Sequence, residues 1–196
     1  MSTVTVPREP AALEADAMAL VPAVCAALEL WDTLKLEVGE AAVVTDGHPW
    51  SRAVALVASW YGALPVVLIS DDAASVPGVI RVSTTGAPDP VRELVVNLQG
   101  RPAVAAAELS GRADAVDLLL EALPASSRVM LAGAAREPLT IDYYVNVHRK
   151  GLRLVSGMLD AGPMHAVDAG ADARAGRARR LLARPARLAA CREAMR

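Results

Sequence analysis

Short apolar runs without polar alternation recur along this chain, and most are separated by segments with helical periodicity. A strand that is apolar at every position has both faces buried, which is typical of a parallel sheet covered by helices on both sides. We expect strands at residues 41–45, 66–70, 79–82, 103–109, 129–132 and 152–158. The pattern predicts an α/β fold with a mostly parallel six-stranded sheet and a ligand site at the carboxyl ends of the strands.

Helical spacing of apolar residues fills most of the remaining segments. Residues 10–36 form the first of these, and Pro22 must kink or divide it. Further helices are expected at 52–61, 90–98, 113–123 and 175–195, the last broken near Pro185, with a helix or turn at 141–150. The chain therefore divides into a flexible arm (1–13), an α/β domain (14–160) and a tail (161–196) with a Gly/Ala-rich connection and an Arg-rich helix.

The net charge of −2 combines an acidic body with a basic tail. Residues 174–196 contain eight Arg and one acid, Glu193, so residues 1–173 carry a net charge of −9. We expect the tail to contact an acidic protein surface, either on this body or on a partner subunit. A nucleic-acid interface is not expected, because the body repels phosphate and only 3 % of the residues are aromatic.

Signals for membrane insertion, export and metal binding are not found in the sequence. No apolar run reaches the roughly 20 residues that span a bilayer, and Glu9, Glu14 and Asp16 argue against an N-terminal leader. Cys25 and Cys191 lie far apart, and together with the three His they show no metal-ligand spacing. We therefore expect a cytoplasmic protein without a bound metal.

Several segments together resemble the nucleotide-binding domain of the medium-chain dehydrogenases/reductases, the zinc alcohol dehydrogenase superfamily. They are LEVGE at 36–40, VVTDGHPWS at 43–51, GA at 62–63, SRVMLAG at 127–133 and VHRKGLRLVSG at 147–157. The resemblance covers about three quarters of the chain and implies a Rossmann-like, doubly wound sheet. It also implies that the family's catalytic domain, with its zinc ligands, has no counterpart in this sequence.

The resemblance points to an altered glycine-rich turn. Matching Gly62 to the glycine that ends the family's first Rossmann helix places the three fingerprint glycines at Asp46, His48 and Ser51. In a dinucleotide site the second glycine lets the backbone approach the pyrophosphate, and the third lets helix and strand pack closely. We therefore expect no cofactor, and NAD(P) is kept as the alternative.

Candidate catalytic residues gather at this turn. Asp46 and His48, two residues apart at a strand end, can act as a general base near neutral pH, with Ser51 beside them. The alternative is that these side chains only fill a vacated groove. The resemblance places Cys25 where the family has a small hydroxyl residue beneath the nicotinamide, so Cys25 is a candidate nucleophile or else a buried core residue.

Candidate cofactor or ligand contacts follow from the same resemblance. Ser70 lies where an NAD-preferring enzyme has its ribose-binding acid, and Asp71 beside it can take that role. Gly133 and Ala134 match the backbone that faces the nicotinamide carboxamide, although a glycine at a strand end is also an ordinary turn. The remaining candidates, in the turn itself, are Gly47 and Trp50.

Two further features bear on assembly and topology. Only residues 71–78 join the second and third strands, whereas a parallel crossover normally needs about a dozen residues, so we expect a strained loop or a different strand pairing. The strand Leu152 to Met158 would leave an exposed apolar edge, which predicts a homodimer or a hetero-complex through this edge.

Three functions are consistent with these observations. We favour a dehydrogenase-like protein that acts on a small molecule by non-redox chemistry, such as cyclisation, elimination or isomerisation, within a complex in bacterial specialised metabolism. The second is a non-catalytic partner subunit that stabilises or completes another enzyme's active site. The third is an NAD(P)-dependent oxidoreductase shortened to its nucleotide-binding part.

Overall fold

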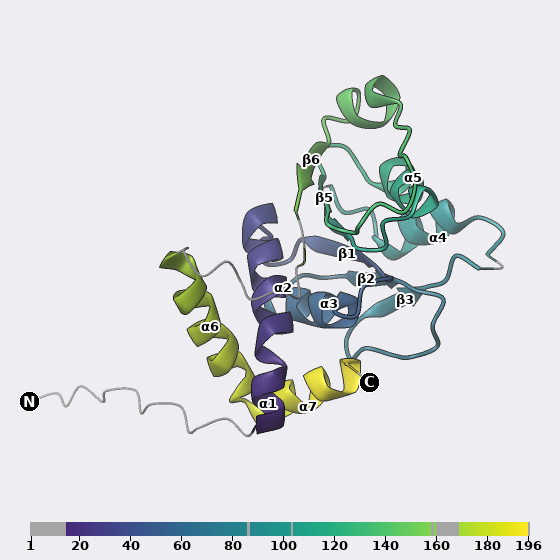
Figure 1. The fold of residues 1–196 in the computed structure, drawn as a ribbon. Coiled ribbons are helices and arrows are strands. Elements are labelled where there is room, and N and C mark those ends of the chain that lie inside the picture. Colours follow the sequence, from purple (N-terminus) through teal and green to yellow (C-terminus); the bar gives the residue numbers. More distant parts are fainter. Residues whose placement is uncertain (1–14, 86, 103, 158, 160–168, 196) are drawn as a thin grey trace, which may run out of the picture.

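The computed structural model describes residues 15–85, 87–102, 104–157, 159 and 169–195, and every statement below concerns these residues. Six parallel strands form one sheet in the order β3-β2-β1-β4-β5-β6 (Figure 1). The strands are β1 (Ala41–Thr45), β2 (Val66–Ile69), β3 (Ile80–Val82), β4 (Val104–Glu108), β5 (Arg128–Leu131) and β6 (Arg153–Ser156). The predicted α/β sheet is confirmed, and each strand lies within its predicted range except β5, which begins one residue earlier.

The helices also follow the sequence pattern. They are α1 (Ala15–Ala19), α2 (Val21–Leu34), α3 (Ser51–Trp60), α4 (Pro90–Asn97), α5 (Ala113–Ala122), the π-helix η1 (Tyr143–His148), α6 (Ala169–Leu182) and α7 (Pro185–Ala194). Pro22 and Pro185 both lie in the first turn of a helix, where the missing N–H costs no hydrogen bond. The predicted divisions near these prolines are therefore confirmed.

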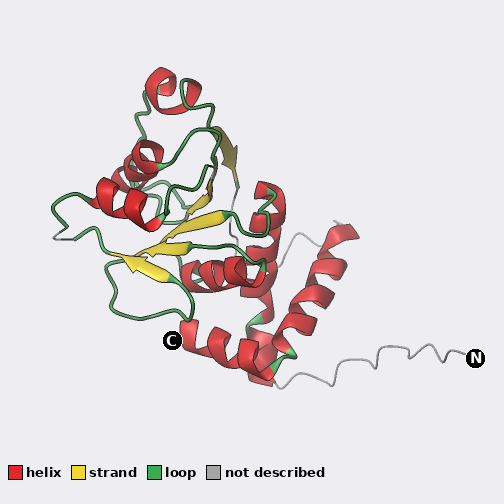
Figure 2. Cartoon of the chain, turned by 180° about the vertical axis from the view of Figure 1, so that it is seen from behind, coloured by secondary structure: helices red, strands yellow, loops and turns green. Residues whose placement is uncertain are grey.

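Helices cover both faces of the sheet (Figure 2). On β1, Ala42 and Val44 face an apolar cluster with α2 and α3, whereas Ala41 and Val43 face another with α4 and α5. Burial on both faces is the reason that the strands show no polar alternation.

The Arg-rich tail forms part of the helical layer that contains α2 and α3. Helices α6 and α7 lie beside α2 and α3 (Figure 1), and Ala178 and Leu182 are fully buried in the same apolar cluster. Arg177 donates to Asp32 at 3.3 Å, and its guanidinium lies 4.7 Å from the centroid of the Tyr61 ring. The tail therefore contacts acidic and aromatic groups of its own body, and α6 begins six residues before the predicted helix.

Residues 17–34 have the length and apolar composition of a membrane span. In the structure α2 packs against α3 and α6, and Val24, Leu28 and Trp31 are fully buried. The Trp31 indole N–H donates to the Val54 carbonyl of α3 at 2.9 Å. The position of α2 in the core accounts for its apolar composition.

The link between β2 and β3 contains no helix. The two strands nevertheless pair in parallel, with Val67 opposite Ile80, so the expected alternative of a different strand pairing is wrong. Gly78 adopts φ +74°, a conformation that glycine reaches without steric cost. Val76 is buried in the core cluster and anchors the loop.

Candidate functional site

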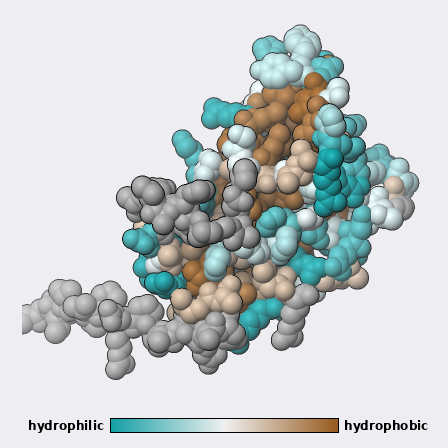
Figure 3. All heavy atoms as spheres, in the orientation of Figure 1, coloured by the Kyte–Doolittle hydropathy of each residue, from teal (hydrophilic) through white to brown (hydrophobic). Residues whose placement is uncertain are grey.

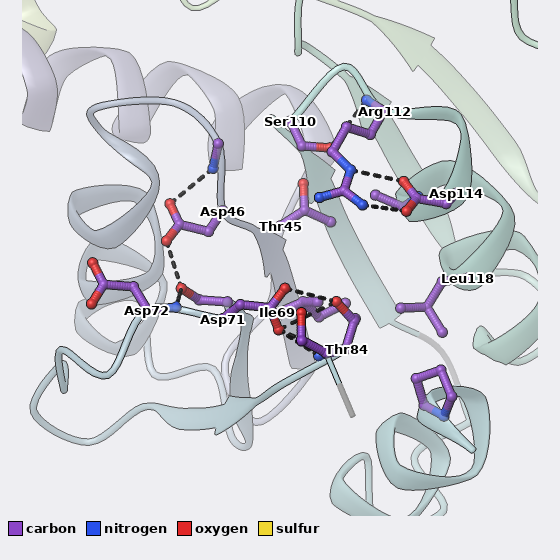
Figure 4. A pocket seen from close by; sticks show the side chains of 15 residues that line it. Thr45, Asp46, Ile69, Asp71, Asp72, Thr84, Ser110, Arg112, Asp114 and Leu118 are labelled. Carbon is purple, nitrogen blue, oxygen red and sulfur yellow. Dashed lines mark hydrogen bonds and ion pairs between the residues drawn. The ribbon is translucent and has the colours of Figure 1, made fainter. Parts of the chain in front are cut away.

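A cavity of about 570 Å³ opens at the carboxyl ends of β1 to β4 (Figure 4). The strand order reverses here, because the chain runs outward from β1 to β3 and then returns to β4 on the other side of β1. Open α/β sheets bind their ligands at this point. The lining residues are Thr45, Asp46, Gly47, Ile69, Ser70, Asp71, Asp72, Thr84, Thr85, Pro90, Ser110, Arg112, Asp114, Ala115 and Leu118.

Asp46 connects the turn after β1 to the end of β2. Its carboxylate accepts the Gly47 N–H at 2.8 Å and the Ser70 hydroxyl at 2.6 Å (Figure 4). Gly47 has φ +138°, and a Cβ at this position would lie 2.7 Å from the Ser110 Cα. The turn therefore needs glycine at 47 for both its conformation and its close approach to the segment after β4.

The rest of the turn bonds to itself. The His48 N–H donates to the Ser51 hydroxyl at 3.1 Å, and the Trp50 N–H donates to His48 Nδ1 at 3.1 Å. The Ser51 N–H donates to the His48 carbonyl at 2.9 Å. Pro49 has no N–H group. Each of the other N–H groups from Gly47 to Ser51 therefore has an acceptor inside the turn.

Of the four candidate catalytic residues, Asp46 alone is among the residues that line the cavity. The Asp46 carboxylate and the His48 ring are directed to different partners, so the bonds in the turn do not make them an acid–base pair. Burial lowers the pKa of His48, which agrees with its Nδ1 acting as an acceptor. Ser51 is fully buried at the start of α3.

Cys25 lies on α2, and its side chain is 1 % exposed within the apolar core. Burial raises the pKa of this thiol, so its environment disfavours the nucleophilic thiolate. This is the environment that the core alternative predicts.

The two candidate ribose contacts have separate partners. Ser70 is 5 % exposed and bonds to Asp46, whereas Asp71 turns toward the segment after β3. Asp71 Oδ1 accepts the Thr85 N–H at 2.9 Å, the Ser83 hydroxyl at 2.7 Å and the Thr84 N–H at 2.8 Å. The bonds from Thr85 and Ser83 hold the pKa of Asp71 well below its usual range.

Two arginines near the cavity, Arg112 and Arg52, are paired with carboxylates, and Arg81 donates to the Asp72 carbonyl at 3.0 Å. Arg112 donates from Nε to Asp114 at 2.9 Å and from Nη2 to the other carboxylate oxygen, and this pairing lowers the pKa of Asp114. Arg52, on α3, donates to Asp72 at the cavity rim. In each pair the carboxylate offsets the attraction of the guanidinium for a phosphate ligand.

Glu108, at the end of β4, bonds to residues of the site without lining the cavity, and the sequence did not single it out. It is 2 % exposed, and its carboxylate accepts the Ser110 N–H at 2.7 Å, the Gly111 N–H at 3.1 Å and the Thr45 hydroxyl at 3.2 Å. The available signal was one acidic residue inside an otherwise apolar run. Glu108 therefore joins the ends of β1 and β4 beneath the cavity.

Gly133 and Ala134 pack against the segment after β4 and do not line the cavity. A Cβ at Gly133 would lie 2.8 Å from Glu108 Oε2, and one at Gly111 would lie 1.8 Å from the Ala134 carbonyl oxygen. These glycines therefore allow the segments after β4 and β5 to meet, as in an ordinary turn at a strand end.

No family model and no curated protein matches this sequence. Among solved structures, galactitol-1-phosphate dehydrogenase from Escherichia coli matches with a TM-score of 0.70 and 14 % identity, over 88 % of this chain and 51 % of that one. Alcohol dehydrogenase TADH from Thermus sp. ATN1 matches with a TM-score of 0.69 and 21 % identity, over 93 % of this chain and 51 % of that one. The protein AibC matches with a TM-score of 0.68 and 21 % identity, over 90 % and 52 % of the two chains.

This chain thus spans about half the length of the solved structures that it matches. The shared fold extends beyond the three quarters of the chain covered by the sequence motifs.

Proposed function

We propose that this chain, which has the Rossmann fold of the medium-chain alcohol dehydrogenases, acts on a small molecule at the strand-end cavity without NAD(P). The observation that carries the proposal is the self-bonded turn, in which Asp46, His48 and Ser51 accept the N–H groups that follow β1. In a dinucleotide site such groups donate to the pyrophosphate. The residues present do not fit that ligand.

Electrostatics adds to the loss of donors. Two like charges 4 Å apart repel by about 4 kcal/mol at an effective dielectric constant of 20. A pyrophosphate bound beside the Asp46 carboxylate would experience repulsion of this order, which corresponds to roughly a thousandfold weaker affinity. The paired arginines Arg52 and Arg112 offer little compensation.

The chemistry that remains is proton transfer. Asp46 lines the cavity. Its Oδ1 accepts the Gly47 N–H within the turn and its Oδ2 accepts the Ser70 hydroxyl at the end of β2, which leaves a lone pair on each oxygen for a ligand. We assign it the role of general base in a non-redox reaction, such as a cyclisation, elimination or isomerisation. The His48 ring holds the turn through the Trp50 N–H.

Calorimetric titration tests this proposal. The unmodified chain should show no binding of NADH or NADPH tighter than about 1 mM. A variant that restores the three glycines, Asp46→Gly, His48→Gly and Ser51→Gly together, should bind NADH at least tenfold more tightly than the parent, because it frees the N–H groups and removes the carboxylate. Micromolar binding of NADH by the parent chain would restore the oxidoreductase alternative.

A second copy of this chain is the partner that we propose for β6. The Arg153 N–H donates to the Ser127 carbonyl just before β5, and the Gly157 N–H donates to the Leu131 carbonyl of β5. The N–H groups of the alternating residues Leu154 and Ser156 therefore point away from β5. Apolar side chains gather over β6 and below η1 (Figure 3). An unpaired edge with this composition favours pairing with another strand.

The assembly is tested by light scattering at micromolar concentration. The parent chain should have the mass of a dimer. Ser156→Pro removes an outward N–H without touching the bonds to β5 and should shift the mass to that of a monomer, whereas Ser156→Ala should stay dimeric. A monomeric parent chain would contradict the proposal.

The alternative of a non-catalytic subunit draws on the exposed side chains of η1. Tyr143 and Tyr144 are 67 % and 63 % exposed beside this apolar region. A subunit of this kind would keep the activity of its complex after Asp46→Asn, whereas the favoured proposal predicts loss of that activity with the fold intact.

A further inference from the structure

The lining of the cavity combines carboxylates with a smaller apolar area. Asp46, Asp71 and Asp72 lie along one side, after β1 and β2 (Figure 4). Across from them, beyond Arg112 and Asp114, the apolar part of the lining comes from Leu118 and Ala115 of α5 and Pro90 at the start of α4, and Ile69 adds an apolar side chain beside Asp71 (Figure 4). A volume of about 570 Å³ is within the usual range for small-molecule sites.

The charges that face this space are mainly negative. Asp46, Asp71, Asp72 and Asp114 line it. Asp72 is paired with Arg52 and Asp114 with Arg112, so Asp46 and Asp71 are the lining carboxylates without an ion pair among the described residues. Arg112 is held by both oxygens of Asp114. The potential inside the cavity therefore favours a cation over a neutral molecule, and a neutral molecule over an anion.

The carboxylates of the cavity can also accept further hydrogen bonds from a ligand. Each oxygen of the Asp46 carboxylate has one donor, and Asp71 Oδ2 accepts the Thr84 hydroxyl at 3.1 Å. Since a carboxylate oxygen can accept two bonds, these atoms are available for donors on a ligand.

We propose that the cavity takes an amine-bearing small molecule that carries an apolar ring and no phosphate or carboxylate group. The ammonium or a hydroxyl group would bond to Asp46 and Asp71, and the ring would lie against Leu118 and Ala115. This assignment rests on the proposed function, because it names the class of ligand for the same site.

A matched series of three probes separates charge from size. Tyramine, 2-(4-hydroxyphenyl)ethanol and 3-(4-hydroxyphenyl)propionate share a phenol ring and differ by carrying an ammonium, a hydroxyl and a carboxylate. Titrations followed by amide NMR shifts should give affinities in that order, with tyramine at least tenfold tighter than the carboxylate. The shifts should map to Thr84, Thr85 and Ser110.

Two variants and one control sharpen the test. Asp46→Asn and Asp71→Asn should each reduce the preference for tyramine over the alcohol at least threefold. Asp117→Asn, at an exposed position on α5 outside the cavity, should leave it unchanged.

The proposed ligand class would be overturned by equal or tighter binding of the carboxylate, or by no binding of tyramine up to 10 mM. It would also be overturned if the shifts mapped elsewhere. Failure of the proposed function is a separate outcome, because it would appear as micromolar binding of NADH whatever the order of these probes.

Discussion

The turn at 46–51 and the cavity below it lie at the same end of the sheet but differ in how their polar groups are satisfied. The turn contributes N–H donors, and its own carboxylate, imidazole and hydroxyl groups accept them. The cavity contributes carboxylate acceptors, some of which retain free lone pairs. In a Rossmann fold the first region normally binds phosphate. The difference teaches that one fold can bond the backbone donors after β1 within their own turn and still keep a ligand-sized space beside them.

The largest expected effect concerns Glu108, the buried carboxylate beneath both regions. Glu108→Ala should reduce the free energy of unfolding by about 3 kcal/mol or more, because it leaves buried N–H and hydroxyl donors without an acceptor. Urea denaturation measures this change. Asp117→Ala, which removes an exposed carboxylate from α5, should change stability by less than about 0.5 kcal/mol. Equal effects of the two variants would show that Glu108 does not hold the two strand ends together.

Gly47 tests whether the closed turn depends on its approach to Ser110. Gly47→Ala places a Cβ 2.7 Å from the Ser110 Cα, and it should destabilise the chain by about 2 kcal/mol or more. Gly39 is the matched control, because it also has a positive φ but a Cβ there would meet nothing within 4 Å. Gly39→Ala should cost only about 1 kcal/mol. If thermal unfolding shows equal losses, the turn tolerates movement away from β4.

The smallest expected effect is the pH dependence of folding stability that arises from Asp71, a carboxylate that lines the cavity. Its pKa is held below the usual value in the folded chain, so the ionised carboxylate stabilises the fold above the unfolded pKa of about 4. This contribution is lost as the pH falls through the lower folded pKa. Since the side chain is exposed, the difference in stability between the parent and Asp71→Asn should not exceed about 1 kcal/mol at pH 7.

That difference should shrink as the pH is lowered below 4. Denaturation curves at pH 7, 5 and 3 measure it, with Asp117→Asn as the control for loss of a charge. A difference that grows toward low pH would have the wrong sign for this account.

Most of the fold could be predicted because it depends on patterns that local sequence carries. The apolar run at residues 41–45 predicted β1, and Pro22 and Pro185 predicted where helices begin. Tertiary packing is consistent with these local preferences. The parallel pairing of β2 with β3 was left open, because the length of the link alone does not exclude a helix-free crossover. The buried Val76 that anchors this loop carries no local signal.

The site was harder to predict because its bonds join residues distant in sequence. The altered turn indicated the loss of a phosphate site, but the bond between Asp46 and Ser70 depends on the pairing of β1 with β2. Glu108 lies within an otherwise apolar strand of the sequence. Its partners Thr45 and Ser110 contact it only in the folded sheet. Spacing along the chain therefore located the region, whereas the direction of each side chain required the structure.

The most direct test of the central claim observes the amide groups of the turn during titration with NADH. The Gly47, His48 and Trp50 N–H groups are already bonded within the turn, so their NMR signals should stay in place up to millimolar NADH. Saturable shifts of these three signals with a micromolar dissociation constant would show that the turn opens to accept a pyrophosphate, and would contradict the account.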